Sequence, residues 1–147
     1  MYLKKMVIVS ILFLALLHIP GLAQERRFNV KGEISFTKKG AIIIQLVTKE
    51  EFESNKDSQF ASIIEVGPED LKKGKTSFSF TNVPEGTYGI KCFQDLNGNK
   101  TLDRGAFGPE EPWGMYRPSR PAFKAPRFEE IAFKVDQDIT DIELELK

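Results

Sequence analysis

Oxygen-bearing side chains recur at every second position of one short segment, and they are the strongest chemical signal in the sequence. They are Asp95, Asn97, Asn99, Thr101 and Asp103. Calcium takes six to eight oxygen ligands from carboxylates, amide carbonyls, backbone carbonyls and water. The five residues match the first five ligand positions of an EF-hand-like loop, in which Thr101 contributes its backbone carbonyl. The segment is therefore a candidate calcium site.

Two residues depart from the EF-hand pattern. Lys100 stands where that loop has glycine, and Ala106 stands where it has a bidentate glutamate. Glu110 or Glu111 would then have to close the site, and two or three carboxylates would give it a weak affinity, with a Kd of roughly 10⁻⁴–10⁻³ M. The alternative is a metal-free turn, in which an Asn-Gly pair at 97–98 supplies positive φ angles and the Asp and Asn side chains bond to backbone amides. The sequence leaves both interpretations open.

The region from Gly105 to Arg127 is a second candidate site, for a ligand. It is rich in proline, and it carries Trp113 and Tyr116 close to Arg117 and Arg120. Long loops in compact domains are often functional, and aromatic rings beside guanidinium groups suit an anionic or sugar-like ligand. In the alternative, the loop folds over the edge of the sheets and its bases pair with acidic residues. These acids are Glu110, Glu111, Glu129 and Glu130.

The elements that must position these residues are predicted to be strands. Apolar residues alternate with polar ones at period two, which is typical of half-buried strands. The pattern covers 28–36, 41–47, 60–66, 76–83, 87–93, 128–135 and 139–146. Residues 67–74 are predicted to be a connector, and Thr48 and Glu51 have capping-box spacing, so 48–58 is either a helical turn or a loop. We therefore expect an all-β fold, an antiparallel β-sandwich of about seven strands that is immunoglobulin-like or transthyretin-like, with a closed barrel as the alternative.

The hairpin that leads into the oxygen-rich loop has a predicted register. Tyr88, Ile90 and Cys92 should point inward, with the residues between them outward. The Tyr88 hydroxyl should find a backbone partner near the Pro84 turn, because a buried phenol needs one. Cys92 is the only cysteine, so an intrachain disulfide is excluded, and we interpret it as a buried, inert thiol.

The N-terminal segment is predicted to be a signal peptide. Lys4 and Lys5 precede an apolar run over 6–19, and small residues at 21–23 offer a cleavage site before Gln24. An uncleaved anchor is the alternative, but the run is shorter than the roughly 20 residues that span a bilayer. We expect a single domain over 24–147 that is exported to the periplasm or further out, with no membrane span after cleavage.

Cleavage would remove whole classes of chemistry. His18, the only histidine, lies in the predicted signal peptide, so the mature chain could not use Ser-His-Asp or Cys-His catalysis or a His-ligated zinc ion. Loss of Lys4 and Lys5 leaves 21 − 2 = 19 basic residues against 21 acidic ones. This balance gives no support for nucleic-acid binding.

The chain also resembles a secreted bacterial domain-of-unknown-function family, number 2141. Its members are similar in a Pro-x-Gly-x-Tyr turn, an Asp-x-Asn-x-Asn-x-x-x-Asp loop and a Gly-x-Pro-x-Glu stretch. The matching residues are Pro84, Gly86, Tyr88, Asp95, Asn97, Asn99, Asp103 and, loosely, Gly108, Pro109 and Glu111. The chain departs from the family at Gln94, where histidine is frequent, and at 114–116. The resemblance implies secretion and a β-sandwich, and it implies no activity.

Two functions fit these observations. The first is a non-catalytic binding or structural module with a calcium-stabilised loop, which contacts a ligand or a partner in the cell envelope. The second is a secreted hydrolase that acts on a glycan through acids such as Asp95, Asp103, Glu110 or Glu111. A glycosidase needs two carboxylates at a defined separation, and no motif singles out such a pair. We therefore expect the module and no enzyme.

The predicted signal peptide can be checked directly. Mass spectrometry of the exported protein should show that residues 1–23 are absent and that the chain begins at Gln24. An intact Met1 on membrane-associated protein would contradict this expectation.

Overall fold

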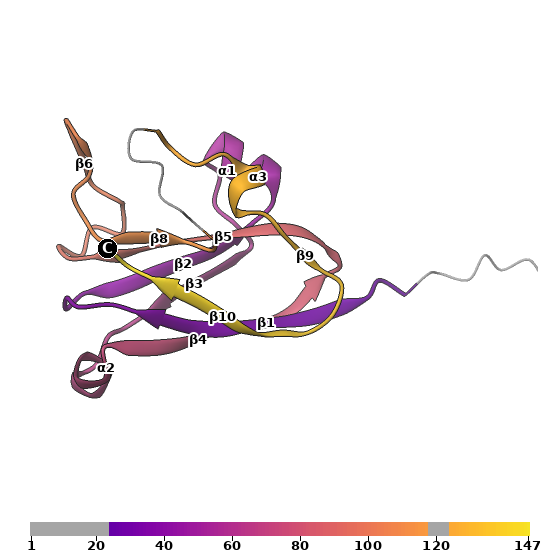
Figure 1. Ribbon diagram of the computed structural model, residues 1–147, viewed down its shortest axis with the longest axis horizontal. Coiled ribbons are helices and arrows are strands. Elements are labelled where there is room, and N and C mark those ends of the chain that lie inside the picture. Colours follow the sequence, from indigo (N-terminus) through magenta and orange to yellow (C-terminus); the bar gives the residue numbers. More distant parts are fainter. Residues whose placement is uncertain (1–23, 118–123) are drawn as a thin grey trace, which may run out of the picture.

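The computed structural model describes residues 24–117 and 124–147. The predicted signal peptide and Arg120 lie outside the described residues. Within them the chain forms two larger β-sheets that pack together and one small two-stranded sheet (Figure 1). One hydrophobic core cluster draws on both larger sheets. The predicted all-β sandwich is confirmed. None of the helices in the described part has the length and apolar character needed to cross a bilayer.

The first sheet has three strands. β1 (Arg27–Ser35) lies in the centre, β4 (Lys75–Pro84) pairs with it in antiparallel orientation, and β10 (Ile139–Glu145) pairs with it in parallel. The parallel pair is a correction to the fully antiparallel sandwich that we expected. It joins segments about 110 residues apart in the chain (Val30 pairs with Ile139), and local alternation carries no information about the direction of such a partner.

The second sheet has the order β3 (Phe60–Ile64), β2 (Ala41–Val47), β5 (Gly86–Asp95) and β8 (Trp113–Met115). β9 (Phe133–Val135) pairs with the start of β5. The two sheets are joined along one side, because Trp113 and Lys147 exchange backbone hydrogen bonds of 3.1 and 3.3 Å. Gly114 permits this approach, since a Cβ there would lie 2.5 Å from the carbonyl oxygen of Glu145.

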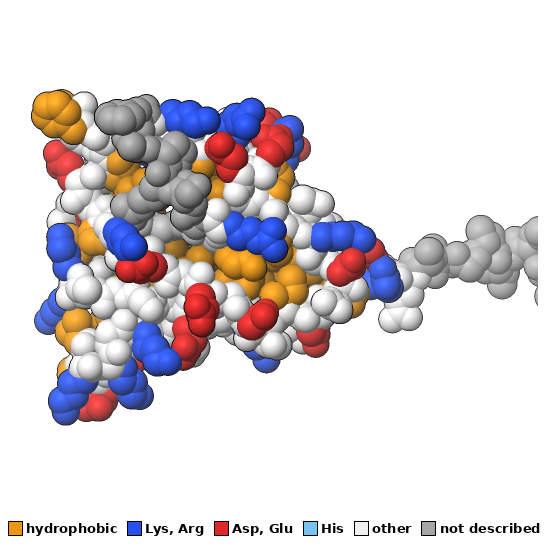
Figure 2. Space-filling view, in the orientation of Figure 1, with side chains coloured by type: hydrophobic (Ala, Val, Ile, Leu, Met, Phe, Trp, Pro, Cys, Tyr) orange, Lys and Arg blue, Asp and Glu red, His pale blue; other side chains and the backbone are white. Residues whose placement is uncertain are grey.

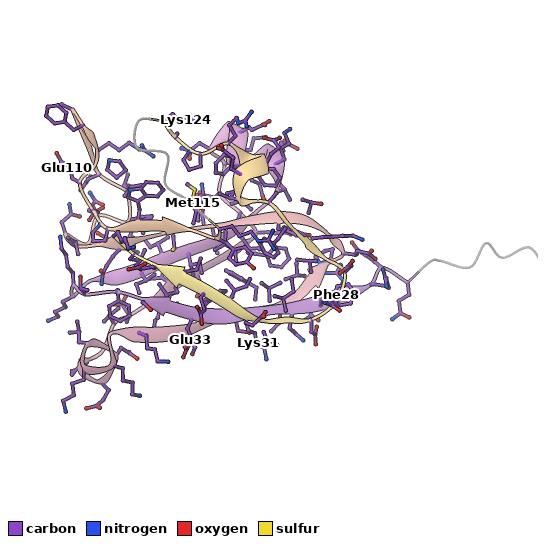
Figure 3. All side chains as sticks on the ribbon, viewed as in Figure 1. Phe28, Lys31, Glu33, Glu110, Met115 and Lys124 are labelled. Atoms are coloured by element: carbon purple, nitrogen blue, oxygen red, sulfur yellow. The ribbon has the colours of Figure 1, made fainter. Side chains whose placement is uncertain are left out.

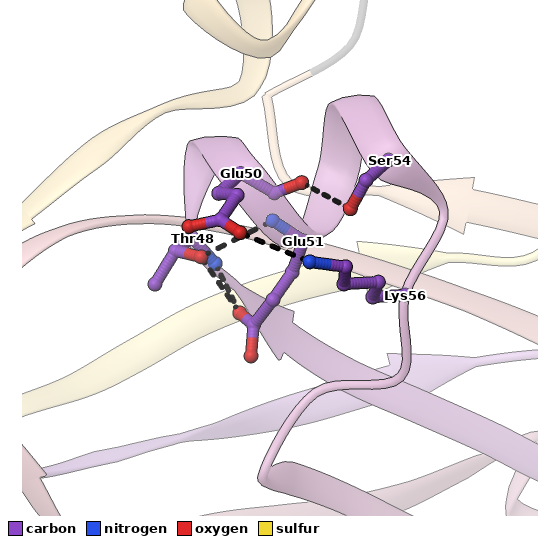
Figure 4. A network of polar contacts seen from close by, with 5 residues as sticks. All are labelled: Thr48, Glu50, Glu51, Ser54 and Lys56. Carbon is purple, nitrogen blue, oxygen red and sulfur yellow. Dashed lines mark hydrogen bonds and ion pairs between the residues drawn. The ribbon is translucent and has the colours of Figure 1, made fainter.

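Three short helices complete the described part of the fold. α1 (Lys49–Ser54) begins with the capping box that the sequence allowed: Thr48 Oγ1 accepts from the Glu51 amide, and Glu51 accepts from the Thr48 amide (Figure 4). α2 (Pro68–Lys73) occupies the predicted connector, with proline in its first turn and Gly74 at its C-cap. Of the two structures predicted for 48–58, a helical turn or a loop, the helix is found, at 49–54.

The third helix corrects the sequence analysis. Residues 128–131 were expected to belong to a strand, but they form α3 (Phe128–Ile131), and only β9 after it is extended. Phe128 and Ile131 are three residues apart, so both face one side of a helical turn. They cover Gly89, where an added Cβ would lie 2.7 Å from Ile131 Cδ1. The outward face of β5 is therefore covered by α3 at this point.

The predicted register of β5 is confirmed. Tyr88, Ile90 and Cys92 are all buried in the core cluster, and the Tyr88 hydroxyl donates to the Pro84 carbonyl at 3.1 Å. Burial raises the pKa of the Cys92 thiol to about 12. The thiolate is the reactive form of cysteine, so this burial makes Cys92 inert as a nucleophile near neutral pH.

Candidate functional site

The oxygen-rich loop begins at Asp95, the last residue of β5. Its side chain is buried, and its carboxylate accepts hydrogen bonds from the amides of Gly98 (2.7 Å), Asn99 (3.2 Å) and Lys100 (2.8 Å). Burial alone would raise the pKa of Asp95, but the amides of residues 97–100 outweigh it and lower the pKa. The carboxylate is therefore held as an anion that orders the turn after it.

The remaining predicted ligands lie on the exposed side of the same loop. The side-chain amides of Asn97 and Asn99 donate to the Asp103 carboxylate at 2.6–3.1 Å. Their Oδ1 atoms accept from the backbone amides of Asn99 (3.0 Å) and Thr101 (2.8 Å). Residues 98 and 100 have positive φ angles of 81° and 61°. The structure therefore brings Asn97, Asn99 and Asp103 together, while the Thr101 amide serves as a donor.

These hydrogen bonds are those of a self-supported turn. Within residues 24–117 and 124–147, no group of three or more His, Cys, Asp or Glu side chains is arranged to hold a metal ion. A calcium site here would therefore depend on amide oxygens as well as carboxylates. Calcium binding stays a prediction.

Glu111 fastens the loop to the body of the protein. Its buried carboxylate accepts from the Leu96 amide at 2.7 Å and from the Asp103 amide at 3.2 Å, at the two ends of the loop. β8 places Glu111, since the Gln94 amide continues the β5–β8 pairing by donating to the Pro112 carbonyl at 2.8 Å. The sequence named Glu111 as a residue that could close a calcium loop, and it does close the loop, by binding backbone amides. We call the contacts of the Glu111 carboxylate with the Leu96 and Asp103 amides the clasp.

A small hairpin projects beyond this clasp. β6 (Arg104–Gly105) pairs with β7 (Gly108–Pro109), and the Glu110 amide donates to the Asp103 carbonyl at 2.9 Å. The Phe107 side chain at the tip is fully exposed. Phe107 was not among the site residues predicted from the sequence. The sequence feature that could have identified it is a large aromatic residue between Ala106 and Gly108, in a turn too short to bury the ring.

The turn between β1 and β2 lies against the start of the loop. Gln94 is fully buried, and its Nε2 donates to the carbonyls of Lys38 (2.5 Å) and Gly40 (3.3 Å). Gln94 Oε1 has no hydrogen-bond partner among the described residues. Gly40 has φ 154°, and a Cβ there would lie 2.4 Å from the Asp95 carbonyl oxygen. Residues 37–40 and the loop after Asp95 are thus packed together at one end of the sandwich.

The second candidate site is built around β8. Tyr116 packs edge-on against Phe133, with ring centroids 5.0 Å apart, and the Arg117 guanidinium lies 5.4 Å from the Tyr116 ring centroid. Trp113 is half-buried in β8, and Arg120 lies outside the described residues. Tyr116 therefore contributes to the packing of the fold, while the exposed Arg117 lies over the ring face, where a cation is attracted.

A surface groove of about 840 Å³ runs beside β8 and β10. Figure 3 labels Met115 and Glu33, which come from the two sheets and flank β10 in this view. The lining residues are Glu33, Ser35, Lys75, Met115, Tyr116, Arg117, Glu143, Leu144, Glu145 and Lys147. Of the predicted ligand residues, the structure brings Tyr116 and Arg117 to this groove, and Trp113 does not line it.

The pairing expected for the basic loop is found in part. Lys124 and Arg127 both approach Glu130, at 3.6 and 3.9 Å. Glu129 instead pairs with Lys49 of α1 at 2.6 Å, and Glu111 binds backbone amides. Among the described residues, Glu130 is thus the acid that pairs with bases of this loop as predicted.

Comparison with known proteins identifies a matching sequence family. The sequence model of a family described as "Uncharacterized protein conserved in bacteria (DUF2141)" matches residues 33–143. No significant match is found among curated proteins or among solved structures. The matched range contains the oxygen-rich loop and β8, while Leu144, Glu145 and Lys147 of the groove lie beyond it.

The role of Asp95 in the turn gives a stability prediction. Asp95→Asn replaces one acceptor oxygen by a donor that would face a backbone amide, so it should lower the free energy of unfolding by about 1–3 kcal/mol. Asp103→Asn, whose partners are the exposed side-chain amides of Asn97 and Asn99, should cost less than about 1 kcal/mol. Urea unfolding in the presence of a chelator measures both.

The same charge predicts a pH dependence. The folded pKa of Asp95 lies below its ordinary value of 3.8, so its contribution to stability is present above about pH 4 and is lost as the pH falls through the folded pKa. Asp95→Asn should remove this part of the acid sensitivity. Equal losses for Asp95→Asn and Asp103→Asn would contradict the assignment.

Proposed function

The chain belongs to this uncharacterized bacterial family, and we propose that it is an exported, non-catalytic binding module. The proposal of export comes from the predicted signal peptide at 1–23. The proposal of binding without catalysis comes from the candidate sites. The groove beside β8 and β10 is the proposed ligand site, and the oxygen-rich loop has a supporting role.

The state of the acidic groups favours binding over hydrolysis. A glycosidase needs a carboxylic acid with a raised pKa as its proton donor. The pKa of Asp95 is instead lowered by amides that surround its carboxylate, and both oxygens of Glu111 accept from the backbone. These two buried acids therefore hold the fold together through backbone contacts, and the lowered pKa of Asp95 is the opposite of what a proton donor needs.

The observation that carries the ligand proposal is the Arg117–Tyr116 pair at the groove. The Arg117 side chain is exposed beside an aromatic ring whose position is fixed by Phe133. The groove also contains two ion pairs, Glu33–Lys75 at 2.8 Å and Glu145–Lys147 at 2.7 Å.

The mixed lining of the groove supports one of the two ligand classes expected from the sequence over the other. Donors and acceptors alternate in the groove, and sugar hydroxyls can use both. A polyanion would meet Glu143 and the paired acids at short range, which is repulsive. We therefore propose an oligosaccharide of the cell envelope as the ligand class.

Calorimetric titration of the exported protein with a panel of envelope oligosaccharides tests this proposal. At least one should bind, and Arg117→Gln should weaken that binding about ten-fold or more, because it removes charge-assisted hydrogen bonds. Arg27→Gln, on an exposed arginine of β1, is the matched control and should bind as the wild type. Release of shorter glycans during the titration would contradict the non-catalytic assignment.

We also propose that the loop binds calcium weakly. In support, Asn97, Asn99 and Asp103 already converge, and rotation of the two side-chain amides would turn their Oδ1 atoms toward the Asp103 carboxylate. This rotation gives up two hydrogen bonds to the backbone, which the ion must outweigh. That cost is a physical reason for the weak affinity of roughly 10⁻⁴–10⁻³ M.

Thermal unfolding with and without calcium tests whether the loop binds the ion. At ten times Kd, calcium should stabilise the folded chain by about 1.4 kcal/mol, or a few degrees in Tm. Asp103→Asn is the sharpest probe, because it should remove the calcium-dependent shift while costing little stability in chelator. Lys100→Ala should leave the shift unchanged. If millimolar calcium leaves the wild-type Tm where it was in chelator, the loop is the metal-free turn.

A further inference from the structure

Phe107 is the most exposed large apolar side chain of the described residues. Its relative exposure is 106%, the value of a side chain that touches no neighbour. Burying a phenylalanine is strongly favourable, yet the two-residue tip of the β6–β7 hairpin holds the ring in water. The ring therefore gains nothing from the fold, and it is free to contact another surface.

The hairpin presents this ring on a firm base. The Glu110 amide bonds to the Asp103 carbonyl, and the Glu111 carboxylate fixes the Asp103 amide from the other side. Both residues at the foot of the hairpin are therefore tied to the clasped loop. An apolar group that is already held in place loses little conformational entropy when it binds, which favours insertion.

The hairpin belongs to one end of the sandwich, which we call the loop end and define as residues 37–40 and 96–109. The Lys38 carbonyl accepts from Gln94, and Gly40 packs on Asp95 and Leu96, so the segments are neighbours. Leu96 is 40% exposed and adds a second apolar side chain there. In Figure 1 the β6 hairpin and the β1–β2 turn lie at the same, left-hand end.

The exposed charge of the loop end is basic. Its exposed bases are Lys38, Lys39, Lys100 and Arg104, and Asp103, its one acid, is half-buried under two side-chain amides. The exposed Glu110 follows at the foot of the hairpin, so four exposed bases stand against one exposed acid. None of the four bases forms an ion pair with a described residue. Figure 2 shows several Lys and Arg side chains along this left edge, apolar atoms at its upper tip, where the hairpin lies, and an acidic side chain just below that tip.

We propose that the loop end docks the protein on the surface of an anionic phospholipid bilayer, with Phe107 inserted among the acyl chains. A fully exposed aromatic tip flanked by unpaired bases matches the two parts of such a surface, since the ring enters the apolar layer and the bases meet the phosphates. A pocket on another protein would use the ring but would leave the four bases unexplained. The inference does not rest on the ligand groove.

Co-sedimentation with lipid vesicles tests the proposal. The exported protein should bind vesicles that contain phosphatidylglycerol and should bind phosphatidylcholine vesicles much more weakly, with binding that falls as salt rises. Phe107→Ser should weaken binding about ten-fold or more, and Phe107→Leu should retain most of it. Lys100→Gln and Arg104→Gln should each weaken it about five-fold.

A matched control separates insertion from general hydrophobicity. Ile63 on the edge strand β3 is 50% exposed, and Ile63→Ser should bind vesicles as the wild type does. All variants share one N-terminus, so any contribution of residues 6–19 is common to them. Since Phe107 has no packing role, Phe107→Ser should keep the wild-type Tm.

Fluorescence reports the insertion itself. Phe107→Trp should add an emission that shifts to the blue with phosphatidylglycerol vesicles, beyond any change of Trp113 in the wild type. Failure of the wild type to bind these vesicles, or equal binding by Phe107→Ser, overturns the proposal. So does self-association that Phe107→Ser abolishes, which would assign the tip to a second copy of the chain.

Discussion

Two buried carboxylates organise this end of the molecule. Asp95 and Glu111 are each almost fully buried, and together they accept five backbone hydrogen bonds. A buried charge without such partners is very costly, so the loop must present its amides to them, and the amides in turn need the carboxylates. This mutual requirement fixes where the loop begins and ends, and so it fixes the base of the β6–β7 hairpin.

The clasp also links the loop to the second sheet. Glu111 is two residues before β8, and β8 pairs with β5, whose last residue is Asp95. The two acids are thus delivered by neighbouring strands, and the hydrogen bond from the Gln94 amide to Pro112 sets their relative register. The same strand continues into Tyr116 and Arg117 beside the groove. One short strand therefore positions the loop, the hairpin and the groove.

Local sequence patterns predicted the parts of the fold that local physics decides. Alternation located the buried faces of β4 and β5, and a buried phenol next to a proline turn predicted the bond from Tyr88 to Pro84. The pattern was wrong at 128–131, because Phe128 and Ile131 can be read as members of a strand or as two positions on one helical turn. The helical turn is favoured because it lets both side chains contact Gly89. Gly89 is distant in the sequence, so a local pattern carries no information about this contact.

In the candidate sites, too, local sequence predicted some features, and contacts distant in the sequence determined the others. The spacing of Asp95, Asn97, Asn99 and Asp103 predicted that their side chains would share a loop, but it could not say whether oxygen or nitrogen atoms would face inward. The direction of a side-chain amide depends on which backbone groups lie near it. The fixed position of Glu111 could not be predicted either, since it requires the pairing of β8, a three-residue strand inside a proline-rich region.

The structural role of Asp95 and Glu111 determines which nearby surface residues can be substituted at little cost to stability. Because Asp95 and Glu111 bind backbone amides, their contacts constrain the shape of the chain and not the side chains that project from it. The side chains of Phe107 and Arg104 are exposed in the hairpin, and Arg117 is exposed over the ring of Tyr116. These three positions can therefore vary at little cost to stability, while the clasp beneath them cannot. A scaffold of this kind separates the groups that hold the fold from the groups that meet a ligand or a surface.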